Sequence, residues 1–185
     1  MKKLDINRVP VTTFILFIIC VIVAAALAGT NYITKPKIAA LQEKSQKEAL
    51  AVVLPADTYE NANLPADSAS KECFIARKDD EIVGYVATAT VNGYGGEVKV
   101  MVGVDMNNTI TGVKVLSAAD ETPGLGMNIT KKDYASQYAG KKADFSDNEI
   151  TAVTGATISS TAARNAVKEA VLFIENAKLK YGEVK

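Results

Sequence analysis

Hydrophobic and polar positions divide the chain into one continuous apolar run and a longer part in which the two kinds of residue alternate. No charged residue occurs at positions 9–34, and positions 11–29 read VTTFILFIICVIVAAALAG, with two threonines as the polar interruptions. At ~1.5 Å of rise per residue this core spans roughly 28 Å, about one bilayer hydrocarbon thickness. The pattern predicts a transmembrane helix over residues 11–33.

The residues around this run indicate how it is used. Lys2, Lys3 and Arg8 precede it, which favours a cytoplasmic segment 1–10 and an extracytoplasmic main domain. A cleaved signal peptide is the alternative, because residues 26–28 read ALA, as at a cleavage site. The apolar run is long for a signal peptide, so a retained anchor is the favoured interpretation.

Apolar residues return at helical spacing after the anchor. They lie among Lys, Glu and Gln at Ile38, Leu41, Ala49, Leu50, Val53 and Leu54. This stripe predicts an amphipathic helix over residues 34–55, stopped by Pro55. Its expected role is a stalk that packs on the domain.

The period then changes to that of short β-strands. Residues 56–71 are polar and rich in turn formers, which predicts a loop. Four segments rich in β-branched residues follow, at residues 72–78, 82–90, 97–105 and 109–118. The connections between them are short turns, at Asp79-Asp80, residues 92–96 and Asn107-Asn108. Tight connections predict an antiparallel meander, because parallel pairs need long crossovers.

Helices are expected after the strands. A loop at residues 119–130 leads to a short helix over residues 131–140. A final helix is predicted from about Ser159 to Tyr181, because Ala163, Ala166, Val167, Ala170, Val171, Ile174 and Ala177 recur on one face. The predicted fold class is α+β: a single transmembrane helix, then one domain (residues 56–185) with an antiparallel sheet packed by helices.

Composition excludes several kinds of chemistry. Lys+Arg and Asp+Glu both number 21, which argues against nucleic-acid binding. The sequence has no His, so imidazole acid–base catalysis and His-ligated metal are excluded. The two cysteines, Cys20 and Cys73, form no disulfide or metal motif, and Cys73 is expected to be buried in its strand.

The segment TGATISS (residues 154–160) places hydroxyl groups just before the final helix. One interpretation is a small-residue turn, with Ser159 or Ser160 as the helix N-cap. The other is an anion site, because the first turn of a helix offers free N–H groups and the positive end of the dipole. Since no His could activate a nucleophile, Thr157 suits a point of attachment better than a catalytic role.

Two glycine-rich loops are further candidates. In ETPGLG (residues 121–126), Gly124 and Gly126 permit close approach of a flat ligand, Leu125 offers an apolar contact and Thr122 a polar one. The loop NGYGGEV (residues 92–98) carries Tyr94 and Gly95 at its centre. The alternatives are a surface loop with a proline turn and a plain hairpin loop.

The N-terminal anchor, GYGGEVKVMVGVD, ADETPGLG and TGATISS together resemble the G subunit of the Rnf electron-transport complex. They are also similar to the C subunit of the sodium-translocating NADH:quinone reductase. The resemblance implies one FMN per chain, bonded as a phosphoester to Thr157 by a separate flavin transferase. It also implies that Glu121, Thr122 and Leu125 line the flavin, while Thr154, Gly155 and Ala156 shape the attachment turn. Relatives usually have Asp where Thr151 stands, with Asp147 and Glu149 close by in this sequence.

The predicted function is a membrane-anchored flavoprotein subunit that relays electrons within an ion-translocating ferredoxin:NAD oxidoreductase. Its expected partners are the other subunits of an Rnf-type complex and the membrane, with no catalytic acid or base and no metal. The alternatives are a C subunit of the sodium-translocating quinone reductase, a cofactor-free pilin-like assembly protein, and an anchored binding or sensory module that holds its ligand non-covalently.

Overall fold

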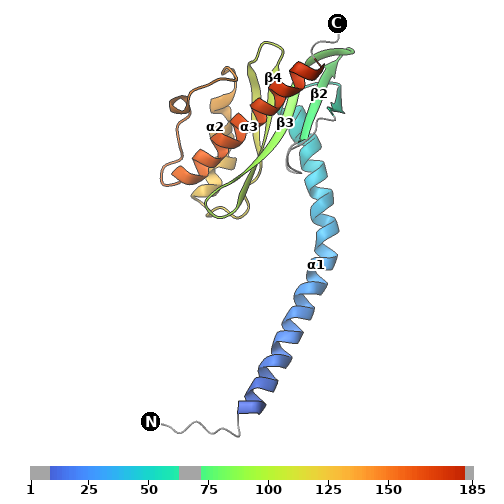
Figure 1. The fold of residues 1–185 in the computed structure, drawn as a ribbon, viewed down its shortest axis with the longest axis vertical. Coiled ribbons are helices and arrows are strands. Elements are labelled where there is room, and N and C mark those ends of the chain that lie inside the picture. Colours follow the sequence, from blue (N-terminus) through green and yellow to red (C-terminus); the bar gives the residue numbers. More distant parts are fainter. Residues whose placement is uncertain (1–8, 63–71, 182–185) are drawn as a thin grey trace. The chain divides into compact units, whose positions relative to one another are not determined.

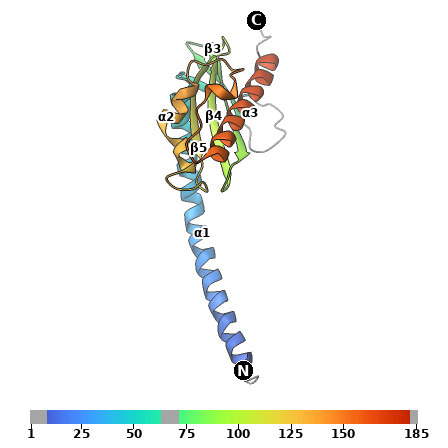
Figure 2. The same cartoon turned by 90° about the vertical axis from the view of Figure 1, so that its left-hand side faces the viewer.

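A computed structural model describes residues 9–62 and 72–181 (Figures 1 and 2). The chain divides into two compact units, Met1–Lys44 and Ser45–Lys185. Helix α1 (Val9–Val53) continues through Pro36, so a single helix covers the expected membrane segment and most of the expected stalk. The second unit contains every strand of the described residues and their other helices.

The first unit exposes its apolar side chains. Phe14, Leu16 and Phe17 on α1 are each at least 60 % exposed, and the same holds for Leu27 and Ile33. By length and composition, α1 is the one helix among the described residues that could cross a membrane, and an 18-residue stretch of it has a mean hydropathy of 2.6. A long strip of this kind is costly in water and favourable in lipid.

Within the described residues of the second unit, five strands form one antiparallel sheet in the order β1-β2-β3-β4-β5. The strands are β1 (Thr58–Asn61), β2 (Glu72–Lys78), β3 (Glu81–Asn92), β4 (Glu97–Asp105) and β5 (Ile110–Ser117). The expected meander is therefore confirmed, and the bounds of β2 and β4 agree with the predicted segments. Asp79 and Asp80 both have positive φ (51° and 64°), as a tight two-residue hairpin turn requires.

Helix α3 (Thr157–Tyr181) covers one face of the sheet and packs on β3 and β4 (Figures 1 and 2). Its buried side is built largely of small residues, at Ala162, Ala163, Ala166, Val167, Ala170, Val171, Ile174 and Ala177. Val98, Val100 and Val102 of β4 meet this side from alternate positions of their strand. The predicted apolar face of the final helix is confirmed.

The end of α1 covers the other face of the sheet. Leu50 and Val53 pack with Val86 and Met101, whose side chains alternate with those that face α3. A Cβ added at Gly103 would lie 2.6 Å from the Val53 carbonyl oxygen, so glycine is needed there for helix and sheet to approach this closely. The same carbonyl accepts a hydrogen bond from the Thr111 hydroxyl.

Three sequence expectations need correction. Residues 58–61 form strand β1, not loop; β1 is an exposed edge strand, so no alternation of apolar residues marked it. The predicted apolar stripe of the stalk is buried only from Ala49 onward, whereas Ile38 and Leu41 are 47 % and 67 % exposed. The short helix expected over residues 131–140 is present as α2 (Lys132–Ala135) followed by a 3-10 turn (Ser136–Tyr138).

Candidate functional site

A tight turn starts α3. The Ala156 N–H donates to the Val153 carbonyl at 3.0 Å, and Gly155 between them has a φ of +76°. The chain therefore reverses at Gly155, and the helix begins immediately afterwards at Thr157. Thr157 is exposed. Its hydroxyl thus stands in the first turn of a helix, where backbone N–H groups lack intrahelical partners.

The two serines that follow do not cap this helix, so that prediction is wrong. Both lie inside α3, which starts two residues before Ser159. The Ser159 hydroxyl donates to Glu121 Oε2 at 2.6 Å, and the Ser160 hydroxyl accepts from the Val153 N–H at 2.9 Å. Both serines are almost fully buried, so these partners satisfy hydroxyl groups that water cannot reach.

A cavity of about 540 Å³ opens beside the start of α3. Its walls come from three segments that are far apart in the sequence, and the lining residues are Tyr94, Thr122, Leu125, Gly126, Gly155, Ala156, Thr157, Ile158 and Ser159. The volume is in the range of small-molecule sites. Tyr94, Leu125 and Ile158 are 69 %, 40 % and 56 % exposed, so large apolar groups stand at the mouth of the cavity.

The structure brings most of the predicted site residues to this cavity. Tyr94, Thr122, Leu125, Gly126, Gly155, Ala156 and Thr157 line it. Thr154, Glu121, Gly124 and Gly95 do not line it. Ile158 and Ser159 were missed as lining residues, although their positions directly after Thr157 at a helix start placed them within reach.

The residues outside the lining shape the loops behind it. Gly124 has a φ of +75°, and its carbonyl accepts from the Asn128 side chain at 2.8 Å. A Cβ at Gly95 would lie 1.9 Å from the Asp120 carbonyl oxygen, so the hairpin loop and the ETPGLG loop touch through backbone at this point. Glu121 is buried, with 1 % of its surface exposed.

A smaller recess of about 230 Å³ also borders Thr157. Thr157 and Ile158 line both spaces, and the recess is completed by Asn92, Thr161, Ala162 and Asn165. Its side chains are more often amides and hydroxyls than those of the larger cavity. Thr157 therefore borders both spaces.

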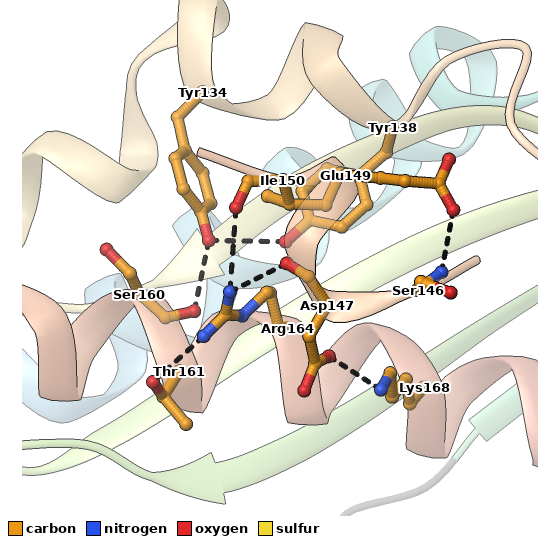
Figure 3. A network of polar contacts seen from close by, with 10 residues as sticks. All are labelled: Tyr134, Tyr138, Ser146, Asp147, Glu149, Ile150, Ser160, Thr161, Arg164 and Lys168. Carbon is orange, nitrogen blue, oxygen red and sulfur yellow. Dashed lines mark hydrogen bonds and ion pairs between the residues drawn. The ribbon is translucent and has the colours of Figure 1, made fainter. Parts of the chain in front are cut away.

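A hydrogen-bond network anchors α3 one turn further on (Figure 3). The Arg164 guanidinium donates to the backbone carbonyls of Asp147 and Ile150, at 2.9 and 3.5 Å. The Tyr134 hydroxyl donates to the Ser160 carbonyl at 3.0 Å and contacts the Tyr138 hydroxyl. Burial raises the pKa of both phenols, so both remain protonated donors at neutral pH.

The charged residues that precede the turn at Gly155 have other partners. Asp147 forms an ion pair with Lys168 at 2.6 Å, and Glu149 pairs with Lys141 at 3.1 Å. These contacts lower the pKa of both carboxyls, Asp147 chiefly through Lys168 and Glu149 chiefly through the Ser146 backbone N–H. Lys142 donates to the Asn107 carbonyl. These side chains form a solvated surface rather than part of the cavity.

Thr151 is held through its backbone. Its N–H donates to Gln137 Oε1 at 2.8 Å, and its carbonyl accepts from Gln137 Nε2 at 3.3 Å. The Gln137 amide thus bonds to Thr151 as a neighbouring strand would. These two bonds fix the backbone before the turn at Gly155, and Thr151 is exposed.

The chemistry of the cavity is that of a binding site. None of its lining residues carries a charge, and hydroxyl groups and backbone supply its polar atoms. Among the described residues no group of His, Cys, Asp or Glu is arranged to hold a metal ion. An apolar space that ends at the N-terminus of a helix suits a flat ligand that carries an anionic group.

Comparison with known proteins identifies the class first. The family model of the FMN-binding domain matches residues 93–172, which contain all three walls of the cavity. The solved structure of Shewanella oneidensis NqrC has a similar fold, with a TM-score of 0.51 at 21 % identity over 69 % of this chain and 72 % of that one. The domain is therefore an FMN-binding domain.

The relatives then specify the family. The model of the RnfG N-terminal region matches residues 1–53. The chain is 34 % identical to the G subunit of the proton-translocating ferredoxin:NAD(+) oxidoreductase complex of Clostridium ljungdahlii, over 92 % of this chain and 94 % of the relative. It is 32 % identical to the G subunit of the Na(+)-translocating complex of Acetobacterium woodii (88 % and 89 % covered). It is 35 % identical to the G subunit of the ion-translocating oxidoreductase complex of Escherichia coli K12 (80 % and 82 % covered). This chain belongs to the family of G subunits of ion-translocating ferredoxin:NAD(+) oxidoreductase complexes, and its role is electron transfer within such a complex.

The residues of the cavity fit FMN. An isoalloxazine ring needs flat apolar walls, which Leu125 and the backbone of Gly126 and Gly155 offer. A Cβ at Gly155 would lie 3.0 Å from Leu125 Cδ1, so a larger residue there would press on this wall. A phosphate needs donors, which the backbone N–H groups in the first turn of α3 supply.

Proposed function

We propose that this chain carries one FMN in phosphoester linkage to Thr157 and relays electrons between other redox centres of its complex. The bond joins Thr157 Oγ1 to the phosphorus of FMN, with net loss of one water relative to free FMN and unmodified threonine. A separate flavin transferase installs it, because the chain has no His and its cavity has no charged side chain to act as a base.

One observation carries the proposal: Thr157 is an exposed hydroxyl residue at the first position of α3 and on the rim of the large cavity. The neighbouring Thr154 lies in the same turn but outside the lining. An ester at Thr157 leaves the phosphate oxygens beside the first-turn N–H groups of the helix, which favour negative charge.

The protein's contribution is to bind, orient and shield the cofactor. FMN supplies the redox chemistry, which lets one- and two-electron carriers exchange electrons. Leu125, Ile158 and Tyr94 offer apolar surface that excludes water from one side of the ring. Their exposure leaves the other side open at the surface of the domain, where another protein of the complex can approach.

The attachment point is tested by intact-mass measurement of the full chain, made together with a flavin transferase and denatured before analysis. The wild type should carry the mass of FMN minus water, and Thr157→Ala should carry none. Thr122→Ala removes the other threonine hydroxyl of the cavity wall and should keep the adduct. An adduct that survives in Thr157→Ala and is lost in Thr122→Ala would show that the ester forms at Thr122, and it would refute this proposal.

The proposed topology places residues 1–10 in the cytoplasm, residues 11–33 in the membrane and residues 34–55 as the stalk. The FMN-binding domain, residues 56–185, then lies on the extracytoplasmic side. The chain is thus a single-pass protein of the cytoplasmic membrane, and α1 anchors it. A periplasmic-active reporter enzyme fused after residue 185 should be active, and the same reporter fused before residue 1 should not. The reverse result would invert the orientation.

The match to the FMN-binding domain and to G subunits favours this flavoprotein function over a pilin-like assembly role. The NqrC likeness supports the shared fold and gives no reason to prefer the quinone reductase.

A further inference from the structure

Glu121 is the most buried acidic residue of the described domain and joins two walls of the cavity without lining it. It is 1 % exposed. Its Oε1 accepts the N–H of Tyr94 at 2.7 Å and that of Gly95 at 3.4 Å. Its Oε2 accepts the Ser159 hydroxyl at 2.6 Å. One carboxylate therefore ties the loop between β3 and β4 to the first turn of α3.

We propose that Glu121 is a positioning residue for the flavin: it fixes the width of the cavity before the cofactor is attached. Tyr94 and Ser159 line the cavity from different segments, and both are hydrogen-bonded to this carboxylate. Tyr94 is 69 % exposed, and its backbone bond to Glu121 ties this wall to the rest of the site. Hydrogen bonds to a buried charged group are among the stronger ones. This inference rests on the proposed function, since it concerns where the flavin lies.

Two glycines of the loops leave space for this carboxylate. A Cβ at Gly93 would lie 2.0 Å from Glu121 Oε1. A Cβ at Gly126 would lie 2.6 Å from Glu121 Oε2 and 2.8 Å from Ser159 Oγ. These glycines leave the space in which Glu121 reaches its donors. Gly155 therefore lies at the cavity wall, Gly93 lies beside the carboxylate, and Gly126 does both.

Amide hydrogen exchange tests the positioning role without the cofactor. The full chain in detergent is compared with Glu121→Ala, both in a Thr157→Ala background that carries no ester. Exchange at the Tyr94 and Gly95 amides should be about 10- to 100-fold faster in Glu121→Ala, because each amide loses its hydrogen-bond acceptor. Glu121→Gln should lie close to the parent, because an amide oxygen can accept both N–H groups and its NH₂ can donate to Ser159. Unchanged exchange in Glu121→Ala would overturn the proposal.

Two further variants keep the test decisive if Glu121→Ala fails to fold. Gly126→Ala leaves the carboxylate but fills its space, and it should speed exchange at the same amides. Asp120→Asn changes the neighbouring exposed carboxylate and is the matched control, which should behave as the parent. Equal exchange in Gly126→Ala and Asp120→Asn would also overturn the proposal.

The flavin-loaded chain supplies a readout that general destabilisation does not move. Visible circular dichroism and the midpoint potential of the flavin report its surroundings in folded protein. Both should change in Glu121→Ala and return towards the wild type in Glu121→Gln. A variant that is folded and flavinylated but has wild-type values would contradict the role. Wild-type chain without any adduct would instead contradict the proposed function. The hydrogen-exchange comparison would still test the positioning role of Glu121, because it does not use the cofactor.

Discussion

The end of α1 offers a sharp test of how the flavin domain is stabilised. Val53 is fully buried against Val86 and Met101, whereas its neighbour Val52 is 66 % exposed on the same turn. Replacing Val53 with Ala removes two buried carbons, at about 0.8 kcal/mol each, and leaves a small cavity. The expected loss in free energy of unfolding is about 2 kcal/mol. Val52→Ala makes the same chemical change in water and should stay within about 0.5 kcal/mol of the wild type.

The assay is urea unfolding of residues 45–185, which form a compact unit with its own core. With a slope near 2 kcal/mol per molar urea, Val53→Ala should lower the midpoint by about 1 M, and Val52→Ala should leave it nearly unchanged. The slope itself should be the same for both variants. Equal midpoints would refute the view that the end of α1 is an integral layer of the domain.

Three other predictions concern single residues. Gly155→Ala should reduce flavin incorporation, as measured by the flavin-to-protein absorbance ratio, because a φ of +76° costs a residue with a Cβ about 1–2 kcal/mol and the added carbon presses on Leu125. Burial raises the pKa of the Cys73 thiol to about 12, so in residues 45–185 a maleimide at about pH 8 should label it only after urea unfolding. The pKa of Asp147 is lowered chiefly by Lys168. This ion pair therefore contributes to stability when the pH is above the ordinary carboxyl pKa of 3.8, and its contribution is lost as the pH falls through the lower pKa of the folded state. Asp147→Asn should therefore flatten the fall in stability between about pH 5 and pH 2, measured by thermal unfolding.

The strands could be predicted because each carries its own signal. Valine occupies every second position of segment 97–105, segment 72–78 is a short apolar run bounded by charged residues, and the turns between strands are too short for crossovers. Strand β1 gave no such signal, because an exposed edge strand pairs through its backbone and needs no apolar face. Sequence periodicity therefore finds buried strands more easily than edge strands.

The start of α3 shows a different limit. A serine before an apolar helical pattern usually caps it, and that rule placed the start near Ser159. Both serines are instead buried inside the helix, where the Ser159 hydroxyl bonds to Glu121 and the Ser160 hydroxyl to the Val153 N–H. The partner of Ser159 is 38 residues away, and such a pairing leaves no trace in local sequence.

The cavity itself was largely predictable, because its small residues and hydroxyls form distinct motifs. The role of Glu121 was not, since a carboxylate in a glycine-rich loop reads equally well as a ligand contact or as a structural anchor. Its donors, at Tyr94 and Ser159, come from the two other segments of the site. Only the fold reveals that the ETPGLG loop joins the other two.

The hydrogen bond between Thr111 and the Val53 carbonyl also sets an order of assembly. The two residues are 58 positions apart, whereas each strand pairs with its immediate neighbour in sequence. Hairpins between consecutive strands form early, because little chain entropy is lost in closing them. At about 5–20 residues synthesised per second, the β5 partner of Val53 is made roughly 3 to 12 seconds after Val53 itself. During that interval Leu50, Val53 and Leu54 cannot contact β5. This layer of the domain is therefore complete only after β5 has been synthesised.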